Sequence, residues 1–121
     1  MNLQNIKMNY NFVGSAYQFD ATNAMSHYKV TLKYNNKSMT IDYYMGKALT
    51  ENDLTTESVI NSLLLDDVSE LSFSEFCHEY GYDNDAISKN TYKQCQNNTK
   101  KLYKMFTTYE IQELQELLQD Y

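Results

Sequence analysis

Two cysteines and two histidines are the side chains of this sequence best suited to nucleophilic or metal chemistry: Cys77, Cys95, His27 and His78. A cysteine nucleophile needs an imidazole within hydrogen-bonding reach. Adjacent side chains on a helix diverge by about 100°, so Cys77 and His78 cannot face each other. His27 could approach either cysteine in the fold, but the sequence suggests no third group to orient it. A zinc site needs about four ligands in closely spaced pairs. We therefore predict two packed thiols and no metal site, with a Cys77–Cys95 disulfide as the alternative if the two residues meet in the core.

Other catalytic patterns are incomplete. Asp83 and Asp85 stand two residues apart, as at the start of an EF-hand loop, but the glycine and the later glutamate of that loop are missing. These carboxylates fit the N-terminus of a helix better. The chain has three glycines, and none belongs to a glycine-rich phosphate loop. We predict a protein without enzymatic activity and without a cofactor.

The charged residues are distributed unevenly along the chain. Sixteen acidic residues against ten basic ones give a net charge of −6, and every basic residue is a lysine. Residues 51–90 carry ten acids against Lys89 alone, whereas residues 91–106 carry four lysines and no acid. Because base readout and bidentate phosphate binding depend on arginine, its absence disfavours direct nucleic-acid binding.

The acidic block suggests a binding surface. A run of carboxylates can imitate the phosphates of a nucleic acid and occupy a basic groove of another protein, and tyrosines add contact area. The alternative, that these acids only solubilise the chain and cap its helices, stays open. The candidate partner-binding residues are Glu51, Asp53, Asp66, Asp67, Glu70, Glu79, Tyr80, Tyr82, Asp83 and Asp85.

A second set of candidates is basic. Lysines near aromatic residues can bind single strands or an RNA backbone, although four of them give only a modest electrostatic attraction. A solvated helix face explains the same pattern. These alternative nucleic-acid-binding residues are Lys93, Lys100, Lys101 and Lys104.

The elements that would position these residues begin with a β-hairpin over residues 26–46. Residues 27–34 alternate between apolar and polar side chains, and residues 38–45 do the same, with a turn at 35–37 between them. The first 24 residues are poorly defined, apart from a short strand at 10–13 that we expect Gly14 to end. A hairpin alone is marginal, so its apolar face needs a further strand or helices.

Four helices are expected over residues 54–121. The first begins after Thr55 or Thr56. Ser72 and Glu75 form a capping box for the second, which Gly81 ends, and Thr107 begins the fourth in the same way. The third helix extends to about Phe106. Its expected apolar stripe is Ile87 or Ser88, Tyr92, Cys95, Thr99, Leu102 and Phe106, and that of the fourth is Ile111, Leu114, Leu117, Leu118 and Tyr121.

Strands followed by helices predict an α+β fold, in which an N-terminal β-hairpin or small sheet packs against about four C-terminal helices. The length fits a single domain, 1–121. No apolar run is long enough to span a membrane, and no secretory leader is evident. We therefore expect a cytoplasmic protein of the host cell that produces it. Its amphipathic C-terminal helix leaves a homodimer open.

Three segments together resemble a group of small phage and prophage proteins. They are Tyr-Tyr-Met-Gly at 43–46, the segment 72–85 that begins Ser-Phe-Ser-Glu-Phe-Cys, and Thr-Tyr-Lys-Gln-Cys at 91–95, within a resemblance that covers about residues 26–106. Such accessory proteins often act on host or defence machinery, and some inhibitors of CRISPR effectors share this size and acidity. The resemblance implies a phage-encoded, anti-CRISPR-like inhibitor whose partner is a host protein such as a CRISPR effector nuclease.

Overall fold

An N-terminal three-stranded antiparallel sheet is followed by four helices, which confirms the predicted α+β class. The computed structural model describes residues 1–17, 24–46, 49–65, 68 and 70–121. In chain order the elements are the short 3-10 turn η1 (Leu3–Asn5), β1 (Lys7–Tyr17), β2 (Ala24–Tyr34), β3 (Lys37–Gly46), the 3-10 turn η2 (Glu51–Asp53), α1 (Thr56–Leu65), α2 (Phe73–Tyr80), α3 (Ala86–Met105) and α4 (Thr108–Leu117).

The predicted hairpin is the central part of the sheet. β2 lies between β1 and β3, and the register pairs Tyr34 with Lys37 across the turn. The turn therefore has two residues, and Lys37 begins the strand instead of belonging to the turn as predicted. Asn35 takes a positive φ of 54°, a conformation that asparagine tolerates better than most residues.

The N-terminal segment corrects the sequence prediction. β1 does not end at Gly14 but continues to Tyr17, and it pairs with β2 along its length. The register shifts between Phe12 and Gly14, so Val13 is an extra residue in the strand. Gly14 has a φ of 156° at this bulge. Gly14, which was predicted to end the strand, instead lets the strand bend and continue.

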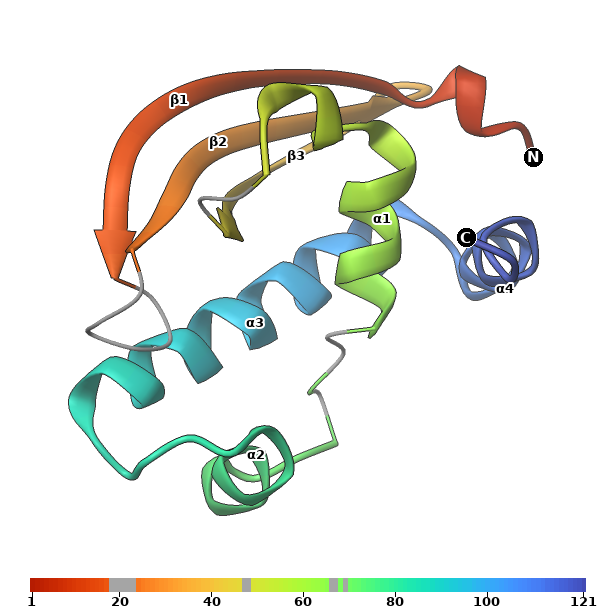
Figure 1. The fold of residues 1–121 in the computed structure, drawn as a ribbon. Helices are drawn as coiled ribbons and strands as arrows, with labels where there is room; N and C mark the ends of the chain where they lie inside the picture. The colour runs from red at the N-terminus through yellow and green to blue at the C-terminus, as the bar shows by residue number, and fades with distance from the viewer. Residues whose placement is uncertain (18–23, 47–48, 66–67, 69) are drawn as a thin grey trace.

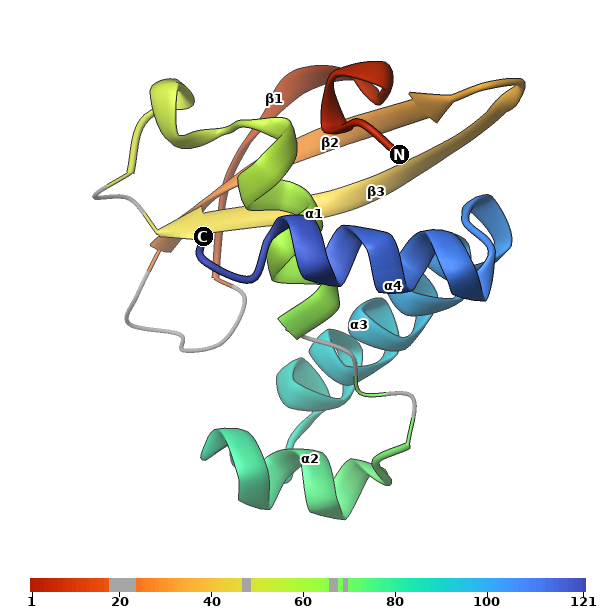
Figure 2. The ribbon, with the colours of Figure 1, turned by 90° about the vertical axis from the view of Figure 1, so that its right-hand side faces the viewer.

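One face of the sheet is packed and the other is open. Figures 1 and 2 show α1, α3 and α4 on the same side of the sheet. Alternate residues of β2 and β3 fill the core on that side, as period-2 patterning requires. These buried side chains are Tyr28, Val30, Leu32, Met39, Ile41 and Met45. The outward-facing neighbours described from His27 to Lys33 and from Ser38 to Tyr44 are exposed or half-buried.

α1 and α4 complete the core. Thr55 caps α1, because its hydroxyl accepts from the Ser58 amide at 3.1 Å. The capping box of Thr107 and Glu110 begins α4 as predicted. The predicted stripe of α4 is partly wrong: Ile111, Leu114 and Leu118 are buried, whereas Leu117 and Tyr121 are exposed. Only three positions of this helix face the core, so the stripe is narrower than the sequence suggested.

α3 crosses the molecule with a partly polar buried face. Asp85 caps it, as its carboxylate accepts from the Ser88 amide at 2.7 Å. Ser88, Thr91 and Thr99 are buried, whereas Ile87 is exposed. The Thr99 hydroxyl donates to the carbonyl of Cys95 one turn earlier, which satisfies it in an apolar setting. Small hydroxyl residues thus occupy places where the sequence would favour larger apolar ones.

α2 stands apart from this core. In both ribbon views it lies at the end of the molecule farthest from the sheet, beside the N-terminal part of α3 (Figures 1 and 2). Its capping box of Ser72 and Glu75 and its end at Gly81, with a φ of 72°, are both confirmed. Within the described part of the chain, none of the helices combines the length and apolar character that a membrane span requires.

Candidate binding surfaces

The α2 end presents two tyrosines in a fixed arrangement. The rings of Tyr80 and Tyr82 are stacked, with centroids 6.2 Å apart and planes within 15°. Both rings also contact Phe76, at 5.1 and 5.0 Å. The Tyr82 amide donates to the carbonyl of Cys77 at 2.9 Å, across the left-handed Gly81. The backbone and the Phe76 ring thus hold the tyrosine pair in place.

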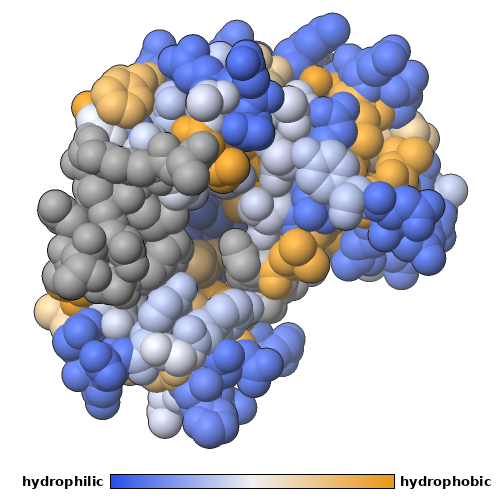
Figure 3. Space-filling view, in the orientation of Figure 1, coloured by the Kyte–Doolittle hydropathy of each residue, from blue (hydrophilic) through white to orange (hydrophobic). Residues whose placement is uncertain are grey.

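Three of the predicted acidic residues lie on α2 or on the segments that flank it, with exposed side chains: Glu70, Glu79 and Asp83. The lower lobe of Figure 3, which holds α2, is mostly hydrophilic or intermediate in hydropathy. Asp85 is engaged differently, because the backbone hydrogen bond from Ser88 holds the pKa of its carboxyl below the ordinary value. It therefore serves α3 as a cap and stays ionised while doing so.

The remaining predicted acids do not join this surface. Glu51 and Asp53 belong to η2, which lies beside the sheet at the opposite end of the molecule from α2 (Figures 1 and 2). Asp53 accepts from the Thr50 amide at 2.8 Å in a capping box. Asp66 and Asp67 lie outside the described residues. The acidic block is therefore continuous in sequence but divided in space.

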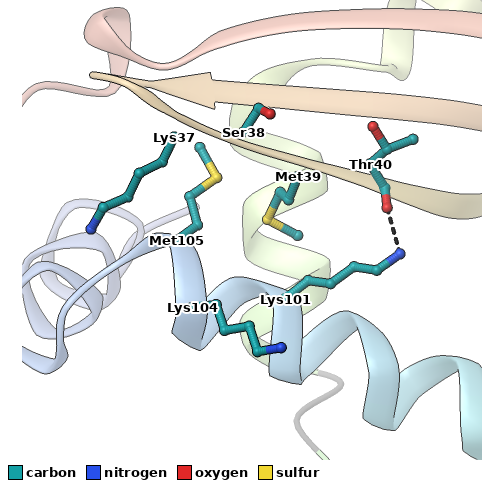
Figure 4. A pocket seen from close by; sticks show the side chains of 7 residues that line it. All are labelled: Lys37, Ser38, Met39, Thr40, Lys101, Lys104 and Met105. Atoms are coloured by element: carbon teal, nitrogen blue, oxygen red, sulfur yellow. Dashed lines mark hydrogen bonds between the residues drawn. The ribbon is translucent and has the colours of Figure 1, made fainter.

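A groove runs between β3 and the C-terminal half of α3, and it encloses about 530 Å³. Lys101 reaches from the helix to the strand and donates to the Thr40 carbonyl at 2.6 Å (Figure 4). Lys37 enters from the hairpin end, and Lys104 projects from α3. The lining residues are Lys37, Ser38, Met39, Thr40, Lys101, Lys104 and Met105.

The groove includes two of the four lysines predicted as an alternative site, Lys101 and Lys104. Lys93 and Lys100 do not line it, although both are exposed on the same helix. Among the described residues, the ion pairs join the N-terminal amine to Glu113 and Lys29 to Asp42, with His27 also at Asp42. None of them includes a lysine of α3. Sequence reasoning missed Lys37, because its approach to α3 depends on how the hairpin packs against that helix.

A polar cluster on the open sheet face was also missed. His27 Nε2 and Lys29 Nζ each lie 2.7 Å from Asp42 Oδ1, and the His27 ring stacks on Tyr44 at 4.5 Å. Burial alone would raise the pKa of Asp42, but the hydrogen bonds from Lys29 and His27 outweigh it and hold that pKa below its usual range. The predicted alternation over residues 38–45 puts Asp42 and Tyr44 on one face of the strand, and this was the only sign of the cluster in the sequence. The arrangement is a solvent-facing ion-pair cluster.

The two cysteines are not joined in a disulfide, so the prediction of packed thiols is confirmed. The Cys77 thiol donates to the Asp83 carbonyl at 3.7 Å, which ties the end of α2 to the following loop. Across the residues that the structure places, no three histidine, cysteine or carboxylate side chains gather in a way that could hold a metal ion. His27 lies with Asp42, so its predicted alternative, an approach to a cysteine, does not occur.

A second hollow of about 310 Å³ lies between α1 and α4. Leu64, Leu65 and Tyr121 line part of it, and the last two are exposed.

No family model matches this chain, and no curated protein or solved structure does either. What the protein does is therefore argued from its own surfaces.

Proposed function

We propose that this protein is a non-enzymatic, phage-encoded inhibitor that binds a nucleic-acid-handling host protein, such as a CRISPR effector nuclease. The contact surface is the α2 end, defined by Glu70, Glu79, Tyr80, Tyr82 and Asp83. One observation carries the proposal: this end holds a stacked tyrosine pair, and exposed carboxylates lie on the same helix and the segments that flank it.

Rigid presentation supports a binding role. Tyrosine contributes a large contact area at low conformational-entropy cost, especially when its ring is already fixed. Tyr80 and Tyr82 are fixed by each other and by Phe76, and the left-handed Gly81 sets the backbone between them. A partner would therefore meet a preformed surface.

Charge indicates the kind of partner. Glu70, Glu79 and Asp83 are exposed, and no described ion pair involves them. Carboxylates beside aromatic rings complement lysine and arginine side chains, which line the grooves of proteins that handle nucleic acids. Because a groove of this kind normally binds phosphates, an acidic occupant would compete with the nucleic acid.

The test is affinity capture from a phage-infected bacterial lysate, with the full chain as bait. We expect a nucleic-acid-handling protein to be retained by the wild type and lost with the double variant Glu79→Lys/Asp83→Lys. The matched control is Glu116→Lys/Asp120→Lys, which makes the same charge change on exposed residues at the end of α4. We expect this control to retain the partner.

Two results would count against the proposal. Recovery of no specific protein by the wild type would remove the binding role, and equal retention by both variants would remove the α2 end as the contact. Inhibition is then measured as the loss of nucleic-acid cleavage or binding by the purified partner when the wild-type protein is added. An active partner in a saturated complex would exclude the inhibitory role.

A further inference from the structure

We propose that the protein has a second binding surface, for the phosphodiester backbone of nucleic acid, where the open sheet face meets the β3–α3 groove. Its residues are Lys7, Lys33, Lys101 and Lys104, with Lys37 at its border. This surface is independent of the α2 end and lies far from it in the fold (Figures 1 and 2).

Two lysines stand opposite each other on the open face of the sheet. Lys7 of β1 stands directly opposite Lys33 of β2, and both side chains are exposed on the open face. Residues directly opposite in an antiparallel pair have Cα atoms about 5 Å apart, and like charges there are unfavourable. No described ion pair includes either lysine. An anionic ligand would relieve this repulsion.

The sheet connects this pair to the groove. Lys33 stands opposite Ser38 of β3, and Ser38 lines the groove. One row across the sheet therefore runs from Lys7 through Lys33 to the groove wall, with neighbouring strands about 4.8 Å apart. Lys101 and Lys104 lie on the far wall. Lys101 is held in position by its bond to the Thr40 carbonyl, and its ammonium group has further N–H donors (Figure 4).

The nearest acids leave this surface positive. Asp42, farther along the open face, is paired with Lys29 and His27. Glu110 is close enough to Lys37 to feel its charge: the pKa of Glu110 is held below the ordinary value first by the backbone hydrogen bond from Thr107, and the charge of Lys37 adds to this. Lys37 is thus partly neutralised, whereas no ion pair among the described residues includes the other four lysines.

The chemistry of these groups defines the ligand. Lysines act as point charges on phosphates, and the chain has no arginine for reading base edges. We therefore expect sequence-independent contact with a backbone, with a dissociation constant of roughly 1–100 µM at physiological salt. The sequence argued against nucleic-acid binding, because it could not show that Lys33 stands opposite Ser38, which lines the groove together with Lys101 and Lys104.

The experiment measures anisotropy of a labelled 20-nucleotide single-stranded DNA with the full-length protein, and repeats it with a duplex of the same sequence. For about four phosphate contacts, affinity for the single strand should fall roughly fiftyfold between 50 and 200 mM salt. The double variant Lys33→Glu/Lys104→Glu should bind at least tenfold more weakly. The control, Lys89→Glu/Lys93→Glu, makes the same charge change on exposed residues in the N-terminal half of α3 and should lose threefold at most.

Several outcomes would overturn the proposal. Absence of wild-type binding to both DNA forms at 50 mM salt excludes the site. Equal losses in the two double variants mean that net charge alone is responsible. Binding to phosphatidylserine vesicles that depends on Lys33 and Lys104, without DNA binding, would assign the surface to a membrane instead. Thermal unfolding of both variants checks that they are folded, as expected for exposed positions.

Discussion

The two ends of this molecule are built from different side chains. The main core joins the sheet with α1, α3 and α4 through mostly aliphatic residues, and α2 contributes no side chain to it. α2 instead packs through an aromatic cluster, in which Phe76 contacts Tyr80, Tyr82 and Tyr92 at centroid distances of 5.0–5.1 Å. The hydroxyl of Tyr92 also donates to the Leu71 carbonyl. The sheet end therefore depends on many elements, and the α2 end on two.

This difference indicates that the sheet end supplies most of the stability, whereas the proposed contact surface lies at the less extensively packed α2 end. A region held by few buried contacts can open locally while the rest stays folded. The α2 end should thus tolerate opening that the sheet end does not. Four mutational tests can break or sharpen this comparison between the two ends.

The largest expected effect is that of Phe106→Ala in the main core. Phe106 is buried and contacts Tyr34 at 5.4 Å, so its truncation should lower the free energy of unfolding by about 4 kcal/mol. Urea unfolding followed by circular dichroism measures it. The control Phe12→Ala, at a position 57% exposed on β1, should cost about 1 kcal/mol or less. A loss below 2 kcal/mol for Phe106→Ala would contradict the assignment of the core.

The matched change at the other end, Phe76→Ala, should act locally. Removing this ring deprives Tyr80, Tyr82 and Tyr92 of their common contact, so α2 should open more often. A local loss of about 3 kcal/mol corresponds to roughly hundredfold faster amide exchange in α2. In the same hydrogen-exchange experiment, the exchange rates of the sheet amides should be nearly unchanged. Equal acceleration in β2 and α2 would show instead that the two ends unfold together.

The capping boxes of α2 and α4 offer a smaller, paired test. Thr107→Ala removes the cap of α4, which packs into the main core, and should cost about 1 kcal/mol of global stability. Ser72→Ala removes the same cap from α2 and should cost less than half as much globally. Chemical denaturation of both variants gives the comparison. Equal global losses would place α2 within the cooperative unit of the sheet.

The smallest effect is expected for Asp42→Asn on the open sheet face. Its pKa is lowered in the folded protein, so Asp42 stabilises the fold above its unfolded pKa of about 4, and this contribution is lost as pH falls through the folded pKa. We expect Asp42→Asn to cost under about 1 kcal/mol at pH 7 and almost nothing near pH 2. Urea unfolding at both pH values measures the difference. An unchanged cost at low pH would exclude the ion pair as its source.

Much of the fold could be predicted because its signals are local. Alternation identified β2 and β3, and the capping boxes at Ser72 and Thr107 are each read within four residues. β1 was predicted only over residues 10–13, because Asn9 and Asn11, which are poor strand formers, occupy its outward positions and because the bulge interrupts its alternation. Pairing between strands that are far apart in the sequence cannot be predicted from local sequence patterns.

The binding surfaces were less predictable for the same reason. The acidic block is continuous in sequence, but the sheet and α1 separate Glu51 and Asp53 from the α2 end. Tyr80 and Tyr82 could be chosen from the sequence because they lie within the acidic block and tyrosine supplies contact area. The basic surface could not be predicted from the sequence, since Lys7, Lys33 and Lys101 belong to three elements whose arrangement only the packed fold determines.

The bulge in β1 also bears on self-association. β1 is an edge strand, and an edge presents unpaired backbone groups that a second chain can extend into an aggregate. The shift at Val13 interrupts the regular edge after Phe12, so an incoming strand finds a uniform template only over Lys7–Phe12. One irregular residue thus limits how far fibril-like stacking could spread along this strand in concentrated solution.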